Sequence, residues 1–285
     1  MLKLELVGRI GNGAWSSVFL MRDVHTSELF AVKEHVLPQE GNAQQLLSCC
    51  AAIVREVEAL MKLRTCPNVI RLHAVKRLDN TLFLIQDYFT RTLKDLIHEV
   101  KDRHWVRTVF CQLVKAVQQC HEHHVAHLDL KPTNVVVRKT TLETFVIDFG
   151  LCQFFNTTPM VFHNPIVTPG YRAPELLMHA HTFTEKVDIW SLGVILLEMY
   201  GHRVWHPECP DDDHKQLLFI CRLFGTPPDA SGRLPDEAKG HHPKVLHSLF
   251  SDVPEGALRL ASRLLHVDPQ KRPNPQEILT DDWLK

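Results

Sequence analysis

The sequence contains His127-Leu128-Asp129-Leu130-Lys131-Pro132-Thr133-Asn134, and Asp148-Phe149-Gly150 follows fourteen residues after Asn134. Val135-Val136-Val137 and Phe145-Val146-Ile147 are apolar runs with the length and residue types of short strands. Two such strands separated by a few polar residues form a small ribbon. We therefore expect this ribbon to hold the polar residues of both stretches at one edge.

Four polar residues would meet at that edge: Asp129, Lys131, Asn134 and Asp148. Three of them carry side-chain oxygens and one carries a positive charge. Such oxygens suit a hard cation such as Mg²⁺, together with a phosphate. One carboxylate then remains to act as a base. The alternative is two charged turns that flank strands, and either motif alone leaves this alternative open.

The composition is that of an ordinary globular chain. Of its 285 residues, 45% are hydrophobic and 23% are charged, and the formal net charge is −1. This balance gives no support for a nucleic acid or an anionic membrane as partner. Residues 1–6 alternate apolar and charged side chains, which is a strand pattern rather than a secretory signal. The most apolar stretch, residues 189–200, is shorter than the ~20 residues of a membrane span.

Cysteines and histidines are numerous but form no complete metal-binding pattern. The eight cysteines are scattered without a Cys-x-x-Cys pair, so we expect reduced thiols in an intracellular protein. His121, His123, His124 and His127 invite a metal-site interpretation. No cysteine or carboxylate framework completes such a site, which disfavours that interpretation.

Apolar periodicity predicts the other main elements. It predicts a helix over residues 46–63 and strands over residues 68–75 and 81–85. A long helix over residues 105–121 is apolar on one face, as expected for a core helix. The most apolar helix, which opens at Asp188, is expected to be buried.

The two polar motifs, in this order and at this spacing, resemble the catalytic loop and the metal-binding triplet of eukaryotic protein kinases. The resemblance runs from Leu6 to about Trp283. It implies an α+β, bilobal fold in a single domain, residues 1–285. A small lobe (1–86) would hold an antiparallel sheet and one helix, a hinge would span 87–91, and a larger, mainly helical lobe would span 92–285. ATP and Mg²⁺ are the implied cofactors.

The implied ATP site begins at a glycine-containing turn. Glycine in a turn lets backbone N–H groups approach phosphate oxygens, although a Gly-x-Gly pattern is also common in plain hairpin turns. Ser16 replaces the third glycine of the kinase pattern, and Gln86 is an unusual polar residue at the back of the pocket. Asp87 and Phe89 would bind adenine through their backbone. The residues expected at the nucleotide are Gly11, Asn12, Gly13, Ala14, Trp15, Ser16, Val18, Ala31, Lys33, Asp87, Phe89 and Val136.

The resemblance also assigns the catalytic groups. Lys33, at the end of an apolar strand, would hold the α- and β-phosphates, although such a lysine is more often a surface residue. Its partner would be Glu56, with Glu58 as the alternative. Asp129 would act as the base and Lys131 would neutralise the γ-phosphate. The Mg²⁺ ligands would be Asn134 and Asp148.

Four further residues match supporting positions of the kinase pattern. Thr168 would hydrogen-bond Asp129 and Lys131 and so link the substrate site to the base. Asp188 would bind the backbone of the catalytic loop. Glu175 and Arg272 would form a buried ion pair, which explains two charges that lie far apart in the sequence.

Lys131 together with Thr168 is the pattern of serine/threonine kinases. The sequence also resembles two branches, the cyclin-dependent kinases and the cell-division-cycle kinases that start DNA replication. We therefore expect a serine/threonine protein kinase that acts on protein substrates. Two alternatives are a pseudokinase that serves as a binding scaffold and a kinase for small molecules.

Three residues of the sequence bear on regulation. Leu128 and Gln153 stand where related kinases carry basic residues that bind a phosphorylated activation segment, and only Arg55 of that basic pocket is matched. We therefore expect activity without such phosphorylation. With no tail beyond the domain, an activating or targeting subunit is expected, and the expected location is the cytoplasm, the nucleus or both.

Overall fold

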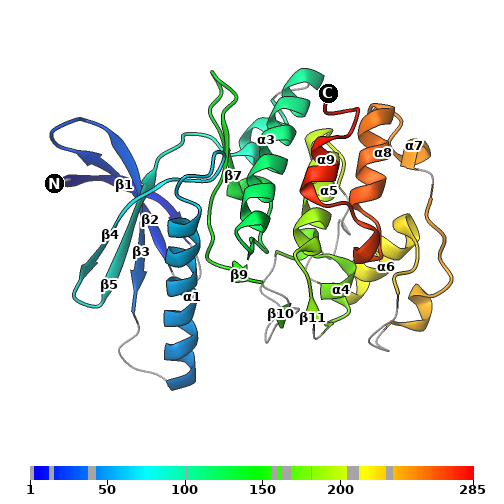
Figure 1. Cartoon of the computed structure of the whole chain (residues 1–285), viewed down its shortest axis with the longest axis horizontal. Coiled ribbons are helices and arrows are strands. Elements are labelled where there is room, and N and C mark those ends of the chain that lie inside the picture. Colours follow the sequence, from blue (N-terminus) through cyan, green and yellow to red (C-terminus); the bar gives the residue numbers. More distant parts are fainter. Residues whose placement is uncertain are drawn as a thin grey trace.

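The computed structural model describes residues 3–12, 16–37, 43–99, 102–155, 160–161, 168–180, 182–203, 212–228, 234–244 and 246–285. Within them the chain forms two lobes, a β-rich N-terminal lobe and a mainly helical C-terminal lobe (Figure 1). The predicted α+β, bilobal fold is confirmed. Among the described residues, no helix has the length and apolar character needed to cross a membrane.

The N-terminal lobe is a five-stranded antiparallel sheet with the strand order β1-β2-β3-β5-β4. The strands are β1 (Leu4–Asn12), β2 (Ser17–Asp23), β3 (Leu29–Val36), β4 (Leu72–Leu78) and β5 (Thr81–Asp87). Side chains alternate between the two faces of a strand. Phe30 and Val32 of β3 are buried against Ile85 on one face, so Lys33 and His35 share the other.

Helix α1 (Ala43–Lys62) lies beside this sheet (Figure 1) and begins three residues before the predicted start. The strand predicted over residues 68–75 starts late, because β4 begins only at Leu72. Asn68 has a φ of 64°, in the left-handed region, which interrupts an extended strand. The backbone at Asn68 and Ile70 instead exchanges hydrogen bonds with Val146 of the C-terminal lobe.

The C-terminal lobe is built around helix α5 (Lys186–Met199), which is buried on nearly all sides. Helix α8 (Glu255–Leu264) packs closely on it. A Cβ at Gly193 would come within 3.0 Å of Leu264 and 2.7 Å of Leu265, the residue after the helix. The long helix α3 (Arg103–Glu122) buries the apolar face that its sequence predicts. The other helices are α2 (Leu93–Ile97), α4 (Pro174–Leu177), α6 (Asp213–Phe224), α7 (Leu246–Leu249) and α9 (Pro275–Leu279).

Three two-stranded ribbons complete this lobe. The predicted ribbon is present as β7 (Val135–Val137) paired antiparallel with β8 (Thr144–Val146). The others pair β6 (Val125–Ala126) with β9 (Gln153–Phe154), and β10 (Met160–Val161) with β11 (Thr182–Phe183). The ribbons therefore set the positions of the polar stretches at residues 127–134 and 148–150.

A buried ion pair connects the segment before α9 to α4. The two terminal nitrogens of Arg272 lie 2.7 and 2.8 Å from the two carboxylate oxygens of Glu175. Arg272 also donates to the backbone oxygens of His266 and Lys186, and its guanidinium lies over the Trp190 ring. These partners compensate the buried charge, which makes the pair tolerable in the core.

We expect Arg272→Ala to lower the free energy of unfolding by about 3–5 kcal/mol, because Glu175 would be left as an uncompensated buried charge. Arg259→Ala is the matched control, since Arg259 and Glu255 form an ion pair with side chains 67% and 75% exposed. Such pairs contribute at most about 1 kcal/mol. Urea denaturation followed by circular dichroism measures both, and equal losses would contradict this account.

Candidate active site

Asp188, near the start of α5, binds the backbone of the loop at residues 127–134. Its carboxylate accepts hydrogen bonds from the backbone N–H groups of His127 and Leu128, both at 2.9 Å, and lies 2.9 Å from Nε2 of His121. Burial alone would raise the pKa of Asp188, but the hydrogen bond and charge of His121 lower it. The carboxylate thus stays ionised, which strengthens its bonds to the loop.

These bonds stabilise a strained backbone. Leu128 has a φ of 68°, a conformation that costs a residue with a Cβ roughly 1–2 kcal/mol. Its side chain is buried in the core of the C-terminal lobe. The backbone is therefore fixed at the two residues that precede Asp129.

His127 connects this loop to the strand that leads to Asp148. Its Nε2 lies 3.0 Å from the backbone oxygen of Ile147, and its Nδ1 lies 3.2 Å from the backbone nitrogen of Asp129. A proton on Nε2 satisfies both contacts. The ring also packs edge-on against Phe149. One imidazole thus holds together the two polar stretches of the sequence.

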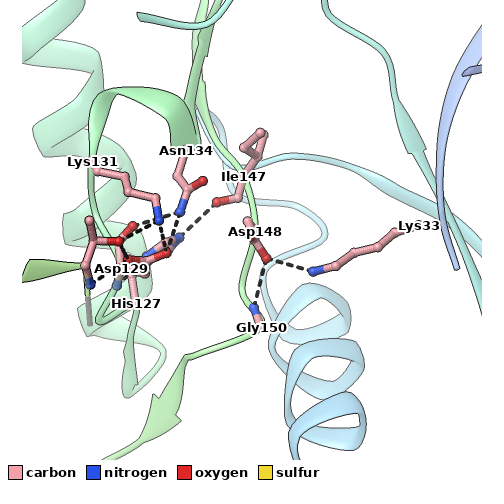
Figure 2. Close-up of polar contacts among 9 residues, drawn as sticks. Lys33, His127, Asp129, Lys131, Asn134, Ile147, Asp148 and Gly150 are labelled. Carbon is pink, nitrogen blue, oxygen red and sulfur yellow. Dashed lines mark hydrogen bonds and ion pairs between the residues drawn. The ribbon is translucent and has the colours of Figure 1, made fainter. Parts of the chain in front are cut away.

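The Asp129 carboxylate is surrounded by hydrogen-bond donors (Figure 2). Its Oδ2 accepts from Nδ2 of Asn134 at 2.9 Å and lies 2.8 Å from Nζ of Lys131. Its Oδ1 accepts from the hydroxyl of Thr168 at 2.7 Å, and this hydroxyl in turn accepts from Lys131 at 2.6 Å. Thr168 lies 37 positions from Lys131 and 39 positions from Asp129 in the chain. The three residues nevertheless form one network with the Asp129 carboxylate at its centre.

The second cluster is centred on Lys33 of β3. Its ammonium lies 2.6 Å from Glu56 Oε1 and 2.7 Å from Asp148 Oδ1. Glu58, the alternative partner, is exposed. A Cβ at Gly150 would lie 3.2 Å from Asp148 Oδ1 and 3.5 Å from the ammonium, so glycine leaves room for this contact.

Charge compensation keeps this cluster ionised. Burial alone would lower the pKa of Lys33, but Glu56 and Asp148 together raise it above its usual range. Burial alone would raise the pKa of Asp148, but the charge and hydrogen bond of Lys33 lower it to about 2. The Asp148 side chain is 45% exposed, whereas that of Glu56 is 1% exposed. Of the two carboxylates, Asp148 is therefore the one that a cation from solvent can reach.

The donor set fits Mg²⁺. This ion is usually bound through one or two carboxylates, with phosphates and waters as its other ligands. Asp148 offers an exposed carboxylate and Asn134 offers an amide oxygen, since its Nδ2 is used by Asp129. No group of three or more His, Cys, Asp or Glu side chains in the described part of the chain is arranged to hold a metal by itself. Nucleotide phosphates would supply the missing ligands.

The residues expected at the nucleotide come from three places. Gly11 and Asn12 end β1, where Gly11 pairs with Val18 across the turn. In the sheet, Val18 and Ala31 flank Lys33 on β2 and β3, and Asp87 ends β5. Val136 lies in the ribbon of the other lobe, and Phe89 packs beside Phe145. Ser16 is described next to β2, but Gly13, Ala14 and Trp15 lie outside the described residues.

Three histidines have contacts that were not anticipated from the sequence. His35 lies on the same face of β3 as Lys33, and its Nε2 is 3.3 Å from Glu56 Oε2. The period of two along a strand could have placed His35 on the face of Lys33, but not beside Glu56. His73 is the extra residue of a β-bulge in β4, and its Nε2 lies 2.5 Å from Asp87 Oδ1. His121, which the sequence grouped with a metal-site interpretation, contacts Asp188 instead.

A family model described as "Protein kinase domain" matches residues 4–284. The match covers almost the whole chain, including both polar clusters and the lobes that carry them. Members of this family phosphorylate proteins with ATP as the phosphoryl donor. This chain belongs to the protein kinase domain family.

Proposed function

We propose that this chain is an active serine/threonine protein kinase that transfers the γ-phosphoryl group of ATP to Ser and Thr hydroxyls of protein substrates. The observation that supports it best is the network around Asp129. This buried carboxylate accepts hydrogen bonds from Asn134 and Thr168 and contacts Lys131. The arrangement suits a base that is held in one orientation beside a positive charge.

Phosphoryl transfer passes through a loose transition state with charge spread over the phosphoryl oxygens, so positioning and electrostatics supply most of the catalysis. Lys33, fixed by Glu56, holds the α- and β-phosphates. Asp129 orients the substrate hydroxyl and accepts its proton, and Lys131 neutralises charge on the γ-phosphate. Asp148 and Asn134 would hold Mg²⁺, which would supply further positive charge at the phosphates.

The proposed nucleotide site uses the backbone of the turn at residues 11–16 for the phosphates. Val18, Ala31 and Val136 provide apolar surface for the adenine, and the backbone at Asp87 and Phe89 provides its hydrogen-bond partners. Gln86 lies at the back of this site, where its buried Nε2 has no hydrogen-bond partner. Gln86 would therefore contribute a polar group at the rear of the proposed site.

Two proposals of a different class compete with this one. A pseudokinase scaffold would be expected to lack Lys33, Asp129, Asn134 or Asp148, and all four are present. A small-molecule kinase is disfavoured by residues 168–175, since the resemblance assigns this segment to peptide binding.

The branch within the family stays a proposal, with the cyclin-dependent and the replication-initiating kinases as the nearest candidates. An activating or targeting subunit also stays a proposal, which full activity of the isolated chain would argue against.

The direct test is transfer of labelled phosphate from ATP with Mg²⁺ to a mixture of proteins, followed by phospho-amino-acid analysis. We expect label on Ser and Thr, and a loss of about 100-fold or more in Lys33→Met and in Asp148→Asn. Label on tyrosine would contradict the proposed specificity. ATP binding without transfer would favour the scaffold, and turnover of a sugar or choline-type acceptor would favour the small-molecule kinase.

Thr168 tests whether the Asp129 network matters for transfer. We expect Thr168→Val to lower kcat/KM about tenfold or more, because Asp129 and Lys131 each lose a hydrogen bond that involves a charged group. Thr168→Ser is the matched control, since it keeps the hydroxyl. Steady-state kinetics with a peptide substrate measures both. Equal rates for the valine and serine variants would show that the hydroxyl is dispensable.

We further propose that activity does not need a phosphorylated activation segment. Leu128 is buried in an apolar cluster, where a phosphate could not be bound. The start of the segment is already anchored, because β9 pairs with β6 and Phe154 lies under the Lys62 ammonium. Phe155 packs edge-on against His121 and His124.

Thr157→Ala and Thr158→Ala should therefore each keep a kcat/KM close to that of the wild type. Both residues lie outside the described part of the chain, so the proposal rests on the anchored segment before them. Thr168→Val, measured in parallel, shows that the assay detects a damaging change nearby. An essential Thr157 or Thr158 would refute phosphate-independent activity.

A further inference from the structure

We propose that His35 is a positioning residue for phosphoryl transfer, which holds Glu56 against Lys33 by donating its Nε2 proton to the second oxygen of the Glu56 carboxylate. The inference rests on the proposed kinase activity and deepens it. No sequence motif of the catalytic machinery includes this histidine.

Only one of the two carboxylate oxygens of Glu56 has a hydrogen-bond partner. Glu56 is 1% exposed, and its Oε1 contacts the ammonium of Lys33. Its Oε2 is buried and has no hydrogen-bond partner. An unsatisfied buried oxygen of a charged group is costly, so a donor at this oxygen would stabilise the inward position of Glu56.

His35 is the complementary group. It is 5% exposed, and neither of its ring nitrogens has a hydrogen-bond partner. Its Nε2 lies 3.3 Å from Glu56 Oε2, which is within hydrogen-bond distance, although the ring is not aligned for the bond. A small rotation of the ring satisfies an unpaired donor and an unpaired acceptor at once.

The strand explains why these groups meet. Lys33 and His35 are two residues apart on β3, so both side chains project from the same face. Glu56 faces them from α1, with one oxygen toward each. β3 would then hold α1 through two side chains instead of one.

The charges around Lys33 also support a role for His35. Lys33 is shared by Glu56 and Asp148, so two carboxylates divide one ammonium. Nucleotide phosphates would add a further anion to the groups that share this ammonium. A second donor on Glu56 would keep α1 in place with the nucleotide bound, which is when the transfer step needs it.

The test compares His35→Leu, which keeps a similar volume without a donor, with His35→Gln, whose amide can donate from about the same position. His25→Leu is the matched control, because His25 lies in an exposed turn of the same sheet. The first measurement is hydrogen–deuterium exchange of the α1 amides over residues 52–60. We expect several-fold faster exchange in His35→Leu and wild-type exchange in His35→Gln and His25→Leu.

The second measurement is phosphotransfer. We expect kcat to fall about tenfold or more in His35→Leu, with KM for ATP little changed, and His35→Gln to restore most of it. In a Glu56→Gln background, His35→Leu should have almost no further effect, because the two residues act as a pair.

Two outcomes would overturn the inference. One is unchanged α1 exchange in His35→Leu. The other is equal damage by leucine and glutamine, which would indicate a packing role only. If the wild type transfers no phosphate, the proposed function fails, but the exchange comparison still decides whether His35 holds Glu56.

Discussion

The ammonium of Lys33 lies between two carboxylates that reach it from different parts of the fold. Glu56 comes from α1 and Asp148 from the end of the ribbon in the other lobe, at 2.6 and 2.7 Å. A buried charge without its partners is strongly unfavourable, so this contact requires β3, α1 and the ribbon to be in place together. The ion pair therefore couples the relative position of the lobes to the geometry of the proposed nucleotide site.

A second constraint fixes the loop that carries the base. Asp188 binds two consecutive backbone N–H groups and thereby offsets the unfavourable φ of Leu128. Asp148 has a similar left-handed conformation, with a φ of 64°. Strained backbone thus occurs at the same two stretches that carry the polar side chains. Helix α5 can support them because it is buried on nearly all sides and fixed by close packing at Gly193.

The sequence was sufficient for the features that depend on local pattern. The ribbon, the long helix α3 and the buried helix α5 follow from periodicity, whereas the fold class follows from the resemblance of the motifs to those of protein kinases. The start of β4 could not be predicted, because Asn68 and Ile70 bond to Val146, which is far away in the chain. The contact between His35 and Glu56 was missed for the same reason, since it depends on how α1 packs on β3. Spacing along a helix leaves Glu56 and Glu58 both open, and only tertiary packing places Glu56 beside Lys33.

The central claim is that Asp129 serves the chemistry, whereas Lys33 and Asp148 serve the nucleotide. It is tested most directly with Asp129→Asn, a substitution of nearly equal size, by measuring single-turnover phosphotransfer and Mg²⁺–ATP binding on the same protein. The account predicts that transfer falls by about 100-fold or more, the usual contribution of a general base, while the Kd for Mg²⁺–ATP changes little. Transfer at the wild-type rate, or a loss explained entirely by weaker ATP binding, would contradict it.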